Sequence, residues 1–143
     1  MASPDTAGKC ILIVEDNPLN MKLFSAMVAA QGYAVLQAGD GLRGLDQARQ
    51  EHPDLIIMDV DLPGMSGIEA TRLLKRDPAT RDIPIVITTA YEYDDEIRAS
   101  GCDGYMSKPI SVANFVELID SLIARDPEPR YVRRMIEENI GAA

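Results

Sequence analysis

The residues of this chain that are best suited to chemistry are acids that directly follow apolar stretches. Asp59 follows the apolar residues 55–58, and Pro63, Gly64 and Gly67 then interrupt any regular structure. A short apolar run that ends in turn residues predicts a strand buried on both faces, as in a parallel sheet. In open α/β sheets the functional site lies beyond the carboxyl ends of the strands. Asp59 is therefore predicted to lie where a carboxylate can react or bind a cation.

Other polar residues hold the same position relative to predicted strands. Glu15 and Asp16 follow a predicted strand at residues 9–14, whose residues 10–14 are all apolar, and the ends of two later runs are followed by Thr89 and Lys108. Each pair of carboxylates about 4 Å apart would repel by roughly 4 kcal/mol at an effective dielectric constant near 20. One lysine cannot neutralise three acids, whereas a divalent cation with hard oxygen ligands can, which favours Mg²⁺ or Mn²⁺.

An acid, a metal, a lysine and a hydroxyl group together suit phosphoryl transfer to a carboxylate. Asp59 would attack phosphorus, while Lys108 and the cation balance the charge on the phosphoryl oxygens and Thr89 donates a hydrogen bond to one of them. The alternative is a set of unrelated polar residues in turns. Convergence of five such residues in one crevice favours the functional interpretation.

The elements that must position these residues alternate along the chain. Strands are predicted at residues 9–14, 33–38, 55–58, 83–87 and 102–106, with helices after each, the fourth of them brief. Alternating strands and helices predict an α/β fold, a doubly wound five-stranded parallel sheet, for which we expect the flavodoxin-like order 2-1-3-4-5. Asn17 and Ser111 are predicted helix caps. The predicted inner helix faces consist of Met21, Phe24, Met27, Val28, Leu42, Leu45, Ala48, Ile68, Leu73, Leu74, Val112, Phe115, Val116, Ile119 and Leu122.

The two ends of the chain differ from its middle in composition. Residues 1–8 are predicted to be a flexible leader, residues 9–125 the folded domain, and residues 126–143 a C-terminal extension. Within the extension, residues 130–140 have the pattern of a short amphipathic helix. Because isolated helices of this length are marginal in water, it either packs on the domain or folds with a partner.

Composition excludes several kinds of partner. A net charge of −9 and a pI near 4.5 argue against binding to nucleic acid or an anionic membrane. No apolar run approaches the roughly 20 residues that a membrane span needs, so we expect a cytoplasmic protein. Cys10 and Cys102 are expected to be buried free thiols, and His52 a loop residue poorly placed for catalysis.

Four separate motifs resemble the receiver domain of two-component response regulators. They are residues 13–18 (Ile-Val-Glu-Asp-Asn-Pro), residues 57–67 (Ile-Met-Asp-Val-Asp-Leu-Pro-Gly-Met-Ser-Gly), Thr89-Ala90 and Lys108-Pro109. The resemblance covers about residues 9–125 and implies a CheY-like fold. It also implies that Asp59 is the phosphoacceptor and that the chain is no enzyme beyond its own phosphorylation and dephosphorylation. Further implied roles are metal binding by Glu15, Asp16, Asp59 and the main-chain carbonyl of Asp61, phosphoryl binding by Thr89 and Lys108, and a conformational switch at Thr89 and Tyr105.

Residues 15–24, 31–33 and 107–111 are most similar to stand-alone receivers of the DivK type. That resemblance implies histidine kinases or histidine phosphotransfer proteins as partners, no DNA binding, and a role in cell-cycle control. A general stress response relay is the alternative. It also implies a monomer, with a phosphorylation-dependent dimer as the other possibility.

The chain between Thr89 and Lys108 is about one helical turn shorter than in the usual receiver. We therefore expect a short or displaced fourth helix, which puts the usual output surface in doubt. Its acids Glu92, Asp94, Asp95 and Glu96 suit a solvated turn better than a second metal site. A further hypothesis is that this segment orders when Thr89 is drawn inward.

Three other functional classes stay open at this point. Asp59-Val-Asp61 resembles the motif of haloacid-dehalogenase-type phosphatases, but it follows the third strand and no residues are left for a cap. A flavodoxin would need a phosphate loop after the first strand, where this chain has acids. A structural adaptor with a vestigial site would not need the full set of chemical groups.

Overall fold

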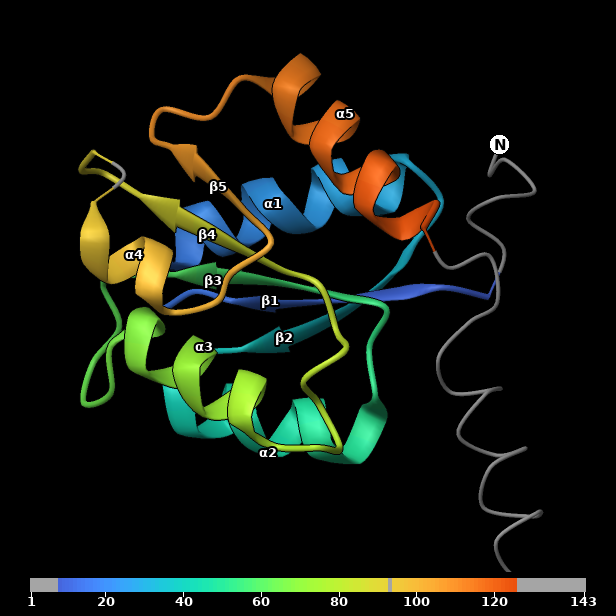
Figure 1. The fold of residues 1–143 in the computed structure, drawn as a ribbon. Coiled ribbons are helices and arrows are strands. Elements are labelled where there is room, and N and C mark those ends of the chain that lie inside the picture. Colours follow the sequence, from blue (N-terminus) through green and yellow to red (C-terminus); the bar gives the residue numbers. More distant parts are fainter. Residues whose placement is uncertain (1–7, 93, 126–143) are drawn as a thin grey trace, which may run out of the picture.

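The structure, a computed structural model, describes residues 8–92 and 94–125 and consists of a parallel sheet between two layers of helices (Figure 1). The five strands have the order β2-β1-β3-β4-β5. Their bounds are β1 Cys10–Val14, β2 Ala34–Ala38, β3 Leu55–Asp59, β4 Ile85–Thr89 and β5 Gly104–Ser107. The predicted α/β class and strand order are confirmed.

The helices cover the two faces of the sheet. Their bounds are α1 Pro18–Ala30, α2 Gly41–Glu51, α3 Gly67–Arg76, α4 Asp95–Ala99 and α5 Val112–Ile123. In Figure 1, α1 and α5 lie on one face, and α2 and α3 lie on the other. Each helix begins after a residue whose side-chain oxygen accepts a backbone N–H from the first turn: Asn17, Asp40, Ser66, Asp94 and Ser111. The short fourth helix is confirmed, with five residues.

A separate apolar core lies on each side of the sheet. Between the sheet and α1 and α5, the rings of Phe24 and Phe115 stack with centroids 5.8 Å apart. On the other side, Leu12 and Ile56 of the sheet belong to one cluster with Leu74 of α3. The central strands β3 and β4 are buried throughout, as their uninterrupted apolar runs predict.

Two predicted strands are shifted along the chain. The fourth strand was predicted at residues 83–87 but runs from Ile85 to Thr89, so that Thr89 belongs to the strand. Pro84 has no N–H to give to the ladder, which delays the start of the strand. The fifth strand begins at Gly104 and not at Cys102, because Asp103 uses its side chain to accept the N–H of Ile85.

Two residues predicted on inner helix faces are exposed. Leu42 is 63% exposed and Val112 is 58% exposed. Both lie in the first turn of a helix, which starts beyond the carboxyl end of the preceding strand, where no sheet is left for the side chain to cover. The expected burial of the thiols is also only half right, because Cys10 and Cys102 are free but half-buried.

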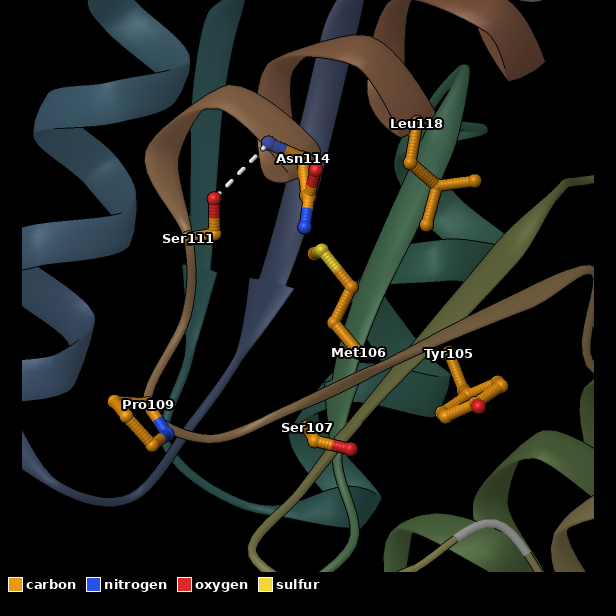
Figure 2. A pocket seen from close by; sticks show the side chains of 7 residues that line it. All are labelled: Tyr105, Met106, Ser107, Pro109, Ser111, Asn114 and Leu118. Carbon is orange, nitrogen blue, oxygen red and sulfur yellow. Dashed lines mark hydrogen bonds between the residues drawn. The ribbon is translucent and has the colours of Figure 1, made fainter.

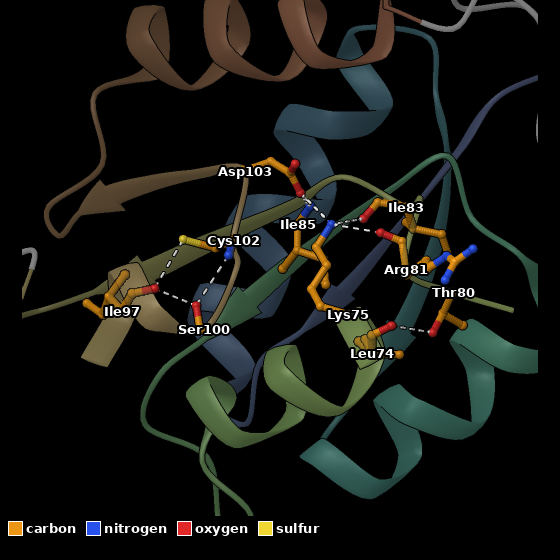
Figure 3. A network of polar contacts seen from close by, with 10 residues as sticks. All are labelled: Leu74, Lys75, Thr80, Arg81, Ile83, Ile85, Ile97, Ser100, Cys102 and Asp103. Atoms are coloured by element: carbon orange, nitrogen blue, oxygen red, sulfur yellow. Dashed lines mark hydrogen bonds and ion pairs between the residues drawn. The ribbon is translucent and has the colours of Figure 1, made fainter. Parts of the chain in front are cut away.

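Carboxylates and a lysine hold the amino ends of the strands together. Asp54 accepts the N–H of Cys10 at 2.8 Å, and Asp103 accepts the N–H of Ile85 at 2.8 Å. Each acid precedes one strand and binds the first residue of its neighbour. Figure 3 shows Lys75 donating to Asp103 and to the carbonyl oxygens of Arg81 and Ile83. The start of the sheet is thus fixed by polar contacts.

The described residues include no helix with the length and apolarity that a membrane span requires. The predicted leader (apart from Gly8) and the predicted C-terminal helix lie outside the described residues.

Candidate functional site

Asp59 is the last residue of β3 and is only 3% exposed. It lies opposite Thr88 of β4 in the sheet register, and the N–H of Val60 donates to the Thr88 carbonyl at 3.0 Å. The chain then turns into α3, where the N–H of Gly67 donates to the Val60 carbonyl at 2.9 Å. Asp59 therefore sits between a paired strand and a tightly packed helix start.

The other two acids come from the end of the neighbouring strand β1. Glu15 is 2% exposed and its carboxylate accepts the N–H of Asn17 at 3.1 Å, whereas Asp16 is exposed. Carboxylate oxygens of Glu15, Asp16 and Asp59 all lie within 4.8 Å of one another. Three acids that are far apart in the sequence are thus brought together at one edge of the sheet.

Lys108 follows β5 and reaches across to these acids. Its Nζ lies 3.1 Å from Oδ1 of Asp59 and 3.5 Å from Oε2 of Glu15. Its backbone N–H donates to the carbonyl of Thr89 at 2.7 Å, which fixes the end of β5 against the end of β4. Removing one partner of such a buried charge pair typically costs about 3–5 kcal/mol.

The charges of these groups influence one another. Burial raises the pKa of Glu15, and the nearby charge of Asp59 adds to the rise, while the Asn17 N–H and Lys108 oppose it. Burial disfavours the ammonium form of Lys108, but its bonds to Asp59 and its attraction to both carboxylates outweigh that effect and raise its pKa. The lysine is held as a cation, and the acids retain more negative charge than it can balance.

Thr89 lies at the end of β4 and is fully buried. Its hydroxyl oxygen accepts the N–H of Tyr91 at 2.9 Å, so its own proton is available to another acceptor. Tyr105 lies in β5 opposite Ile87 and is 43% exposed. The structure thus places Thr89 on the strand next to Asp59, and Tyr105 one strand further out.

Asp61 is exposed and follows β3 by two residues. Within the described part of the chain, no backbone amide donates to its carbonyl oxygen. The carboxylates of Glu15, Asp16 and Asp59 are hard ligands of the kind that divalent cations prefer, and the Asp61 carbonyl stays a predicted further ligand. The residues present therefore fit a divalent metal ion.

Two residues at the site have roles that the sequence interpretation missed. Asn17 was predicted only as a helix cap, yet its N–H also orients the Glu15 carboxylate. Gly67 was predicted only as a residue that breaks regular structure, yet a Cβ there would lie 1.9 Å from the carbonyl oxygen of Asp59. A glycine at the first position of an otherwise good helix pattern, just after a strand, is the signal that could have found it.

Comparison with known proteins agrees with this geometry. The response regulator receiver domain family matches residues 11–120. The polar-differentiation response regulator DivK of Brucella ovis is 48% identical over 118 residues, which cover 80% of this chain and 96% of that protein. DivK of Brucella anthropi matches with the same identity and coverage.

Solved structures show the same fold. The receiver domain of a sensor histidine kinase from Pseudomonas aeruginosa has a TM-score of 0.77 and 32% identity, covering 82% of this chain and 99% of that one; its structure has a magnesium ion coordinated in the active-site cleft. The chemotaxis protein CheY4 of Vibrio cholerae has a TM-score of 0.76 and 26% identity, covering 81% and 99%. These findings do not favour the phosphatase or the stress-relay alternative. The chain therefore belongs to the family of response regulator receiver domains, the phosphoacceptors of two-component signalling.

Proposed function

We propose that Asp59 accepts a phosphoryl group from a phosphohistidine of a partner protein. The observation that carries this proposal is the contact of Lys108 Nζ with Asp59 Oδ1 at 3.1 Å beside two further carboxylates. Glu15 is equally buried but lies 3.5 Å from the ammonium group of Lys108, and Asp16 is exposed.

In the proposed step a carboxylate oxygen of Asp59 forms a bond to phosphorus, and the bond between phosphorus and the imidazole nitrogen breaks. The electron pair of the broken bond stays on the imidazole, which takes up one proton from water and leaves as a neutral group. Lys108 moves from the Asp59 carboxylate to the incoming phosphoryl oxygens, and the Thr89 hydroxyl donates its free proton to one of them. Attack of water on the acyl phosphate later returns inorganic phosphate and free Asp59.

The cation in this proposal is Mg²⁺, with Mn²⁺ as an alternative, held by the carboxylates of Glu15, Asp16 and Asp59 and by the main-chain carbonyl of Asp61. When bound, it offsets the negative charge of the acids and of the phosphoryl oxygens. The excess of acids over Lys108 supports this assignment.

Thr89 and Tyr105 form the proposed conformational switch. The Thr89 hydroxyl is tied to the N–H of Tyr91, which starts the short connection to α4. Movement of Thr89 toward a phosphoryl group would therefore pull on the segment before Asp95. Tyr105, with its half-exposed ring, is the residue proposed to reorient in response.

The proposed partners are histidine kinases or histidine phosphotransfer proteins, in a cell-cycle relay of the DivK type. Leu19 and Leu23 on α1 are 74% and 52% exposed, and Ala26 and Ala30 continue the same apolar stripe at helical spacing. The stripe begins just after Asn17, beside the acids, which suits an apolar helical surface that carries the histidine. We propose a cytoplasmic monomer, which does not bind DNA or membranes, with dimer formation on phosphorylation as the alternative.

The test is transfer of phosphate from a phosphorylated histidine phosphotransfer protein to the full chain in the presence of Mg²⁺. We expect one phosphoryl group per chain by intact mass, lost in Asp59→Asn and retained in Asp46→Asn, an exposed acid on α2. Labelling that persists in Asp59→Asn would overturn the assignment. Release of many phosphates per chain from small phosphomonoesters would instead indicate a phosphatase.

A further inference from the structure

A groove of about 420 Å³ lies between β5 and α5, away from the acids of the site. In Figure 2, Met106 extends from β5 toward Asn114 and Leu118 of α5, and Tyr105 and Ser107 line the strand side. The groove has both apolar and polar lining groups, so it suits an amphipathic occupant better than a purely apolar one.

The rim of the groove carries apolar surface that the described residues leave exposed. Tyr105 on β5 is 43% exposed, and Leu118 of α5 is only half-buried. An occupant that buried these side chains would gain roughly 25 cal/mol for each Å² of apolar area removed from water.

The chain itself supplies a segment of fitting length and pattern. Beyond Arg125, the last described residue, 18 residues follow, and they include Pro127 and Pro129, a residue type that disfavours continuation of a helix. The apolar residues after these prolines recur at helical spacing: Tyr131, Val132, Met135, Ile136 and Ile140. They would form one face of a helix at residues 130–140, about as long as α5.

Geometry allows this segment to return along α5. α5 has 12 residues and is therefore about 18 Å long, and the groove lies at its amino-terminal half. A helix of similar length, reversed by a turn at residues 126–129, would place Ile136 and Ile140 within about one turn of Leu118 and Asn114. Reaching the groove needs no part of the chain to be stretched.

Charge argues against a second copy of the chain as the occupant. Residues 126–143 carry three basic residues (Arg130, Arg133 and Arg134) and four acids (Asp126, Glu128, Glu137 and Glu138), so the segment itself is nearly neutral. The chain as a whole carries a net charge of −9, so a second copy brought to this face would meet general repulsion. We infer that residues 126–143 of the same chain bind the groove between β5 and α5 and cover it, so that a partner using this face must displace them.

The inference predicts short distances between named methyl groups of the full chain. We expect nuclear Overhauser cross-peaks between the methyl groups of Ile136 and Leu118. A sample that mixes differently labelled molecules distinguishes contacts within one chain from contacts between two. Ile136→Asp should abolish the cross-peaks and shift the amide resonances of Tyr105, Asn114 and Leu118.

Ala142→Asp is the matched control, because it adds the same charge to the same segment beyond Ile140, its last large apolar residue. It should leave the cross-peaks and the groove resonances unchanged. Absence of the cross-peaks in the natural chain, together with no effect of Ile136→Asp on the groove, would overturn the inference and leave the groove to a partner protein. Cross-peaks found only between differently labelled molecules would overturn it as well, in favour of a second copy.

Discussion

Replacement of Gly67 by alanine tests how closely the start of α3 is packed against the phosphoacceptor strand. The Cβ of alanine would lie 1.9 Å from the carbonyl oxygen of Asp59 and 2.7 Å from its carbonyl carbon. Ordinary contacts of a Cβ begin near 3.4 Å, so helix or strand must move by about 1.5 Å. The obstacle is backbone and not the end of a flexible side chain, which leaves no inexpensive way to relax.

The expected cost combines two effects. Overpacking of this kind typically destabilises by about 1–3 kcal/mol, and loss of the bond from the Gly67 N–H to the Val60 carbonyl adds about 1 kcal/mol. We expect a loss of about 3 kcal/mol in the free energy of unfolding, equivalent to a fall in Tm of about 12 °C for a domain of this size. A displacement of about 1 Å at the reacting group should also slow phosphoryl transfer by about 10²-fold.

Thermal unfolding followed by circular dichroism, with transfer rates measured below the Tm, checks both effects. Gly39→Ala is the matched control, because a Cβ there meets nothing within 4 Å and the backbone does not require glycine. It should change stability by less than about 0.5 kcal/mol. A Gly67→Ala protein that melts within about 2 °C of the Gly39→Ala protein would refute the reasoning.

Three further predictions concern polar groups. Thr80→Val removes the buried hydrogen bond from the Thr80 hydroxyl to the Leu74 carbonyl, so it should lower the free energy of unfolding in urea by about 1–2 kcal/mol. Thr71→Val removes a buried hydroxyl that has no partner among the described residues, so it should be neutral or stabilising. Equal losses of stability in the two variants would contradict this prediction. Burial raises the pKa of Cys10 from 9.0 to about 11, so less thiolate is present at pH 8 and its alkylation should be about 100-fold slower than in the urea-unfolded chain; equal rates would argue against that burial. Mg²⁺ at about 100 times its Kd should stabilise the protein by about 2.7 kcal/mol, and a chelator should reverse this gain. Asp16→Asn, a change at an exposed residue, should weaken the stabilisation by Mg²⁺. An unchanged response to Mg²⁺ in that variant would remove Asp16 from the proposed ligand set.

Much of the fold could be predicted because the strands are marked in the sequence by short apolar runs. The apolar runs before Glu15 and Asp59 have no polar interruption, and the caps Asn17 and Ser111 mark helix starts, so strand order and the convergence of strand ends followed from general rules. The same rules predict Lys108 beside Asp59, and in the structure its Nζ lies 3.1 Å from Oδ1 of Asp59.

The errors occurred where a local pattern competes with tertiary context. Leu42 and Val112 fit the helical period, but the period does not reveal where the sheet ends and stops covering a helix. The start of β5 depends on Asp103, whose side chain accepts the N–H of Ile85, 18 residues earlier in the chain. The contact between Gly67 and Asp59 joins two backbones that are close only in the folded chain, and its one trace in the sequence is a glycine at the start of a helix pattern.

Acidic residues lie at both the amino ends and the carboxyl ends of the strands, and they have different roles at the two ends. At the amino ends, Asp54 and Asp103 each accept a hydrogen bond from the first residue of a neighbouring strand, whereas Asp59 lies at the carboxyl end of β3. Substitutions at Asp54 or Asp103 can therefore change the free energy of unfolding without changing the rate at which a phosphoryl group is taken up. Robustness and signalling chemistry are in this way exposed to selection separately, although the same type of side chain serves both.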